Sequence, residues 1–136
     1  MGLDFNHPTP DGERSRCCPH WSYGGFNDFR TRLAASEGFD LDEMQGFGKG
    51  EYFTDGRVHG TRPWDEIDTP LKPLLNHSDC DGHLTPEECA QVAPRLREVV
   101  NGWPDTIEHH YHRLSALHLA ACMEACAAAG ENLEFC

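Results

Sequence analysis

Large apolar side chains are scarce in this chain, and their scarcity limits the size of the hydrophobic core that it can build. Leucine, isoleucine, valine and phenylalanine together occupy 25 of the 136 positions. That share lies just under the roughly 20% below which a strongly charged chain tends to remain disordered. The length suits one domain. We therefore expect a single small core and a large proportion of irregular loop.

Acidic side chains outnumber basic ones by 23 to 11, which gives a formal net charge of −12. Such a surface repels the phosphate backbone of nucleic acids and the headgroups of anionic lipids, whereas it favours cations and basic partners. No stretch approaches the roughly 20 apolar residues of a membrane span, and the N-terminus lacks the basic start and apolar run of a signal peptide. We expect a cytoplasmic protein that binds neither nucleic acid nor membrane, and whose seven cysteines are reduced.

The apolar pattern predicts helices along much of the chain. Apolar residues recur at helical spacing in residues 25–37, 64–75, 86–100 and 105–130, and a short helix is expected after Asp40. The clearest boundary is Thr85-Pro86-Glu87-Glu88, which combines an N-cap, a first-turn proline and the glutamate of a capping box. Pro94 is expected to kink the helix that follows. In the last helix, one apolar face is expected to contain Ile107, Tyr111, Leu114, His118 and Ala121.

No alternating pattern typical of strands is visible, so the predicted fold class is all-α. We expect a small bundle of about four to five helices that includes a helix–loop–helix unit. Residues 1–19 contain three prolines, two glycines and few apolar residues, and we interpret them as a flexible, disordered arm. Residues 20–136 then form a single helical domain. An aromatic cluster is interpreted as part of its core; it consists of Trp21, Tyr23, Phe26 and Phe29.

Residues 77–88 resemble an EF-hand loop. Such a loop binds calcium through oxygen ligands at positions one, three, five, seven, nine and twelve, with a glycine at position six. Gly82 takes position six in this alignment, and Leu84 supplies the apolar residue of position eight. The ligand positions after the first hold, in order, Asp79, Asp81, the carbonyl of His83, Thr85 and Glu88. The resemblance implies a divalent-cation site, calcium foremost, with Glu88 as the bidentate ligand.

Position one holds His77 where the EF-hand family has an aspartate, and a neutral nitrogen donor suits a hard cation poorly. The leucines of the incoming helix, at 71, 74 and 75, are about one residue out of step with a loop that starts at 77. A reduced affinity is therefore expected. Two alternatives remain open. The segment is a turn with Asx hydrogen bonds before a capped helix, or it is a zinc site formed by His77, Cys80, His83 and Cys89.

Further histidines and cysteines recur at helical spacing near the C-terminus. His118, Cys122 and Cys126 follow one another at four-residue intervals. We interpret these cysteines mainly as small core residues of an alanine-rich helix. His109 and His112 lie one turn apart, and we interpret them as exposed, solvated side chains.

Several segments resemble parts of small uncharacterised proteins of actinobacteria and their phages, namely HWSYGGF, DEMQGFG, LLNHSDCDGHLTPEEC, VAPRL and LEFC. This resemblance implies no activity. No catalytic motif is present, so we do not expect an enzyme. An enzyme that uses His77 or Cys80 in a cleft remains a third hypothesis. The leading hypothesis is a small acidic helical protein that binds a divalent cation and regulates, or interacts with, an unknown protein partner. The alternative is a zinc-structured or metal-free helical interaction protein.

Overall fold

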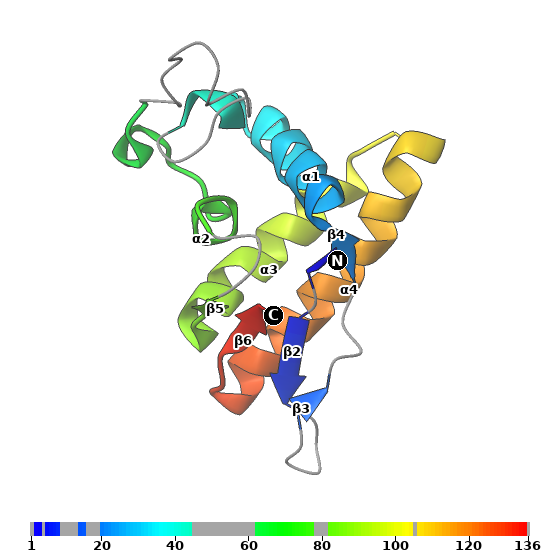
Figure 1. Ribbon diagram of the computed structural model, residues 1–136. Coiled ribbons are helices and arrows are strands. Elements are labelled where there is room, and N and C mark those ends of the chain that lie inside the picture. Colours follow the sequence, from blue (N-terminus) through cyan, green and yellow to red (C-terminus); the bar gives the residue numbers. More distant parts are fainter. Residues whose placement is uncertain are drawn as a thin grey trace.

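The computed structural model describes residues 2–3, 5–8, 14–15, 20–44, 62–77, 82–104 and 106–135 (Figure 1). The helices are α1 (Tyr23–Ser36), α2 (Lys72–Leu75), α3 (Pro86–Asn101) and α4 (Ile107–Ala129), with single 3-10 turns at Leu41–Glu43 and Trp64–Glu66. The strands are β1 (Gly2–Leu3), β2 (Phe5–Pro8), β3 (Arg14–Ser15), β4 (Trp21–Ser22), β5 (His83–Leu84) and β6 (Leu133–Phe135). None of the described helices is both long enough and apolar enough to cross a membrane.

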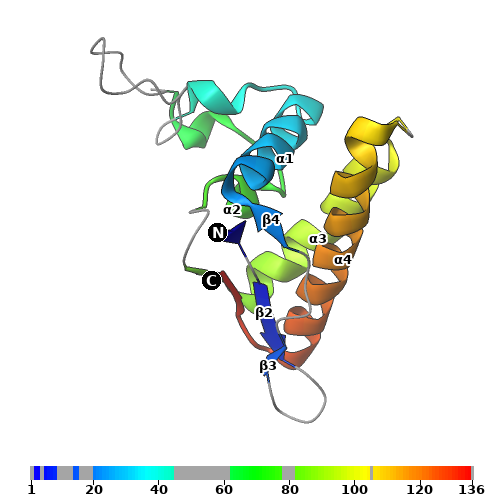
Figure 2. The ribbon, with the colours of Figure 1, turned by 45° about the vertical axis from the view of Figure 1, so that its right-hand side comes forward.

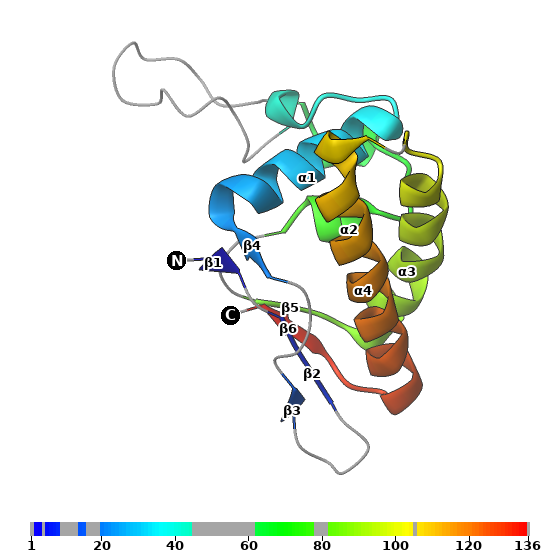
Figure 3. The same ribbon diagram turned by 90° about the vertical axis from the view of Figure 1, so that its right-hand side faces the viewer.

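Helices α3 and α4 form an antiparallel pair, and α1 lies across the end at which α3 finishes and α4 begins (Figure 3). The Nε1–H of Trp103, in the turn between α3 and α4, donates a hydrogen bond to the Ser36 hydroxyl at the end of α1, at 2.8 Å. On the outer surface, the Arg97 guanidinium of α3 pairs with both carboxylate oxygens of Glu124 on α4, at 2.8 and 2.7 Å. The predicted helical character of the chain is therefore confirmed. The continuous helix predicted over residues 64–75 is wrong, because the structure has only a 3-10 turn at Trp64–Glu66 and one α-helical turn, α2, at Lys72–Leu75.

The prediction of a purely α-helical fold is wrong, because short strands complete the structure. Strands β3, β2, β6 and β5 form an antiparallel sheet in that order, and β1 pairs with β4. Figure 2 shows the strand β2 beside the C-terminal strand β6, next to the end of α4. Each strand has only two to four residues, so none is long enough to display the alternation by which strands are recognised in a sequence.

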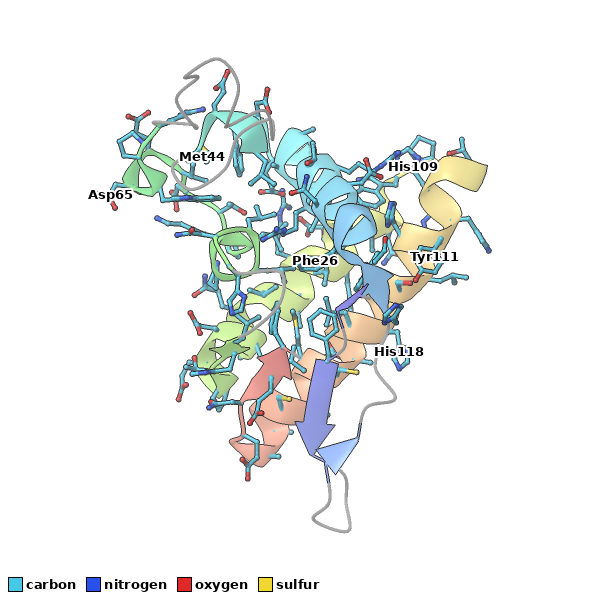
Figure 4. All side chains as sticks on the ribbon, viewed as in Figure 1. Phe26, Met44, Asp65, His109, Tyr111 and His118 are labelled. Carbon is cyan, nitrogen blue, oxygen red and sulfur yellow. The ribbon has the colours of Figure 1, made fainter. Side chains whose placement is uncertain are left out.

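The N-terminal segment that was expected to be a flexible arm contributes to the core through Phe5. This ring is fully buried and packs edge-on against Phe135 of β6, with ring centroids 4.8 Å apart. Trp21 stacks on Phe29 of α1, with ring centroids 4.7 Å apart. Phe26, also of α1, packs against Trp21 in the same cluster (Figure 4). The core role predicted for Trp21, Phe26 and Phe29 is therefore confirmed.

Helix α4 buries a different face from the one that the apolar pattern indicated. Tyr111 and Leu114 are 54% and 55% exposed, and Tyr111 and His118 lie on the outer side of the helix (Figure 4). The buried residues of the helix are His112, Ser115, Ala116, Leu119, Ala120, Cys122, Met123 and Cys126. Both faces carry apolar side chains, so the sequence pattern alone does not distinguish the face that packs against α3.

The ends of the long helices follow local rules. Gly130 ends α4 in the left-handed conformation, with φ of 69°, a geometry that a side chain would strain. Helix α3 begins at the predicted capping box and runs through Pro94 without interruption to Asn101. The predicted boundary of α3 is therefore confirmed, and the predicted last helix is confirmed with its start at Ile107 and its end before Gly130.

Candidate functional site

The segment that resembles an EF-hand loop lies between α2, which has four residues, and α3. Of the loop itself the structure describes His77 and residues 82–88, whereas Asp79, Cys80 and Asp81 lie outside the described residues. Gly82, at the predicted turn position, has a φ of 94°. A Cβ atom built there would lie 3.1 Å from Cε1 of His77. A glycine is therefore required at this position both by the backbone conformation and by the close approach of the histidine ring.

The two residues after Gly82 form strand β5, which pairs with the C-terminal strand β6. His83 lies opposite Glu134, and Leu84 lies opposite Leu133. The amide of Phe135 donates to the Gly82 carbonyl at 2.9 Å. Leu84 is 1% exposed, as expected for the apolar residue of position eight. The second half of the loop is therefore extended, anchored in the core by one side chain and held by the end of the chain.

Thr85 and Glu88 close the loop with the predicted capping box. The Glu88 amide donates to the Thr85 hydroxyl at 3.1 Å, and the Thr85 amide donates to Oε1 of Glu88 at 2.9 Å. These bonds satisfy two of the amides that the start of a helix leaves without intrahelical partners. Each carboxylate oxygen accepts more than one bond, so this contact leaves further lone pairs on Glu88. A capped turn and a cation-binding loop both use this geometry.

The His77 side chain folds back over the loop that it begins. Its Nε2 lies 3.0 Å from the carbonyl oxygen of His83, and because a carbonyl only accepts, Nε2 carries the proton. The ring stacks on Phe135 of β6 with centroids 3.9 Å apart and an angle of 29° between the ring planes. The ring of position one is thus fixed between Gly82, the carbonyl of position seven and the C-terminal strand.

Arg30 of α1 binds the backbone at the start of the loop. The sequence pattern did not predict this role. Its Nη1 donates to the carbonyls of Leu75, at 3.5 Å, and of His77. The side chain is 3% exposed, with its guanidinium 4.7 Å from the centroid of the Phe26 ring. The sequence held one indication of this burial: Arg30 lies on the same face of α1 as the apolar residues Phe26 and Leu33. A buried cation next to an acidic loop is a feature that any ion site here has to accommodate.

A cavity of about 510 Å³ opens beside the loop, between α2 and the start of α3. Its charged and titratable lining groups are those of Asp68, Lys72, His77 and Glu88. The remaining lining residues are Ile67, Thr69, Pro73, Asn76 and Gln91. Glu88 therefore has access to solvent through this opening.

The residues of the zinc alternative do not converge where the structure describes them. His77 contacts the backbone of residue 83, whereas the His83 side chain is exposed. Cys89 is buried, and its thiol faces Cys126 and, at 4.0 Å, the Leu84 carbonyl. Within residues 82–104, 106–135 and the other described ranges, no group of three or more histidine, cysteine, aspartate or glutamate side chains is arranged to hold a metal ion.

The described cysteines divide into one disulfide-bonded residue and two free thiols. Cys122 is disulfide-bonded, which differs from the expectation that all cysteines are reduced. Cys89 and Cys126 are free and buried. Their mutual hydrogen bond and their burial raise the pKa of the Cys89 thiol. A thiol with a raised pKa is a poor nucleophile at neutral pH, so Cys89 acts as a core residue. The core position predicted for Cys122 and Cys126 is confirmed, because both are buried.

His112 is buried, so its predicted exposure to solvent is wrong. The Nε1–H of Trp21 donates to Nδ1 of His112 at 3.1 Å, and Nε2 of His112 lies 3.0 Å from Oδ2 of Asp28. Because an indole nitrogen only donates, the ring is held as the tautomer with its proton on Nε2. Burial alone would raise the pKa of Asp28, but hydrogen bonds from Arg32 and His112 hold it below its ordinary value. This network links α1 to α4.

No family model, curated protein or solved structure matches the chain. The geometry of the loop and of the groups around it therefore carries the functional argument.

Proposed function

We propose that residues 77–88 bind one divalent cation, calcium foremost, and that the protein acts as a cation-regulated module that contacts another protein. The observation that carries this proposal is the conformation of residues 82–88. A glycine with positive φ, an extended and buried position eight, and a capped glutamate at position twelve follow one another at EF-hand spacing.

The charge of the surrounding segment supports cation binding. Residues 64–90 contain seven acidic side chains and a single lysine, Lys72. Carboxylates that are held close together repel one another, and a bound dication relieves that repulsion. The expected result of binding is a more stable fold, because the cation binds the folded chain and not the unfolded one.

The ligands follow from the resemblance and from the described geometry together. Asp79 and Asp81 supply side-chain oxygens, His83 its carbonyl, and Thr85 a hydroxyl or a bound water. Glu88 supplies its carboxylate while it caps α3. Because β5 pairs with β6, a change in the loop reaches the C-terminal strand directly. Contact with a protein partner through that end of the molecule is the expected output.

The test is a thermal melt of the chelator-treated full chain with increasing calcium chloride. Binding at about 100 times Kd stabilises by about 2.7 kcal/mol, which raises the melting temperature by several degrees. Glu88→Gln should abolish the rise, because the amide keeps the capping acceptor but loses the anionic ligand. Glu87→Gln is the matched control, since it removes the same charge from an exposed neighbour in the same helical turn.

Two results would overturn the proposal. One is a wild-type protein that shows no stabilisation by millimolar calcium or magnesium. The other is a calcium response that survives Glu88→Gln as fully as it survives Glu87→Gln.

A metal-free interaction protein is the second candidate, because two hydrogen-bonded contacts close the loop without an ion. These are the capping box of Thr85 and Glu88 and the contact between the His77 ring and the His83 carbonyl. Elemental analysis of protein purified without chelator distinguishes the candidates. Stoichiometric calcium favours the first proposal, stoichiometric zinc favours a cysteine–histidine site, and the absence of metal together with a flat calcium titration favours the second.

A further inference from the structure

We propose that the His77 ring is a built-in competitor of the cation, so that the ion binds only by displacing the ring from the loop. This inference rests on the proposed function and concerns the regulation of that same site. It assigns to position one a role that differs from ligation: His77 holds the loop closed in the absence of the ion and sets the concentration at which the ion enters.

The competition is for the carbonyl oxygen of His83. In the EF-hand alignment this oxygen is the ligand of position seven, and a bound calcium ion lies about 2.3–2.6 Å from such an oxygen. In the structure the Nε2–H of His77 points at the same oxygen from 3.0 Å. The hydrogen of an N–H group carries positive charge, so it repels a dication at that oxygen. The ring and the ion therefore exclude each other.

The ring also fills space inside the turn. Its Cε1 and Nε2 atoms lie 3.1 and 3.3 Å from the position where a Cβ of Gly82 would be. The opposite contact is the stack on Phe135, at 3.9 Å between centroids. A ring held on both sides and by a hydrogen bond is a defined part of the closed loop.

The backbone of His77 is held independently of the ring. Arg30 of α1 donates to its carbonyl and to that of Leu75. The loop therefore keeps its starting point when the ring leaves, and the ring is the part that moves. Because the ring stacks on Phe135, its departure removes a contact of strand β6 and transmits ion binding to the C-terminal strand.

The test is an isothermal calcium titration of chelator-treated wild-type protein, His77→Ala and His118→Ala. Removal of the competing ring should tighten calcium binding by about tenfold, which corresponds to about 1.4 kcal/mol. His118→Ala is the matched control, because it removes an exposed imidazole of α4 that lies outside the loop. It should change the affinity less than twofold. His77→Gln retains an N–H donor without the aromatic stack and should give an intermediate affinity. It keeps the test decisive if the alanine variant does not fold.

Each outcome separates this inference from the proposed function. Equal affinities of wild type and His77→Ala overturn the competition and leave the ion site standing. Binding by His77→Ala alone supports the competition and overturns ion binding by the wild-type protein. Binding by neither overturns both. In addition, proton NMR of the calcium-free wild type should show the His77 ring protons shifted upfield by Phe135, and their return towards unshifted positions on calcium addition. Shifts that calcium leaves unchanged while it binds would overturn the displacement.

Discussion

Replacing His112 by phenylalanine should lower the free energy of unfolding by about 2 kcal/mol. The phenyl ring keeps the stack on Phe29, whose centroid lies 5.7 Å from the histidine ring, so little packing is lost. The cost arises at Trp21, which is 1% exposed and whose N–H loses its acceptor. An unsatisfied buried donor costs about 1–3 kcal/mol. The bond to Asp28 adds little, because that carboxylate is half exposed and water replaces the lost donor.

Urea unfolding followed by tryptophan fluorescence and by circular dichroism measures this change. The two probes should give coincident transitions, with a lower midpoint and an unchanged m-value. Asp28→Asn is one control: the amide oxygen still accepts from His112, and we expect a loss below about 1 kcal/mol. His118→Phe is the second control, because it makes the same substitution at an exposed position of the same helix and should change stability by less than about 0.5 kcal/mol.

The reasoning would be refuted if His112→Phe were as stable as the wild type, because the indole N–H of Trp21 would then not depend on the histidine. An equal loss from His118→Phe would refute it as well, since the effect would come from the added ring and not from the buried network.

Two further predictions concern titratable groups. The hydrogen bond from Arg97 holds the pKa of Glu124 below its ordinary value of 4.5; the stabilisation by this pair is therefore complete above that value and is lost as the pH falls through the lowered pKa. Glu124→Gln should flatten the decline in unfolding free energy between about pH 5 and pH 3, and an unchanged acid transition would contradict this. Cys89 should resist alkylation in the folded protein at pH 8 and react after unfolding in urea, because its contact with Cys126 and its burial raise its pKa. Peptide mapping by mass spectrometry checks this, and rapid labelling of Cys89 in the folded state would contradict it.

Local signals in the sequence were sufficient for the long helices α1, α3 and α4. The capping box places the start of α3 at Pro86, and a single glycine, Gly130, ends α4. The same kind of signal was sufficient for the turn before α3. Gly82 has a positive φ, and Thr85 and Glu88 form the predicted capping box. These features depend on residues within about four positions of one another, so the local sequence is enough to predict them.

The role of His77 and the involvement of Arg30 were not predictable from the same information. The carbonyls that Arg30 approaches belong to residues 75 and 77, far along the chain, and His77 stacks on Phe135 near its other end. Only the packing of α1, the loop and β6 brings these groups together. The sequence indicates only that a histidine at position one is a poor cation ligand. Its contacts in the fold make it a candidate competitor of the cation for the His83 carbonyl.

The sequence by itself determined where the long helices α1, α3 and α4 form and which residues cap α3. It did not determine residues 64–75, where the predicted helix is reduced to a 3-10 turn and the four residues of α2. The tertiary structure decided that two- to four-residue strands pair across the chain, that Phe5 belongs to the core, and that α4 buries His112 and exposes Leu114. The physical reason is that both faces of α4 carry apolar groups, and strands this short have no stability of their own. Such elements take their conformation and their buried side from partners that are distant in the sequence.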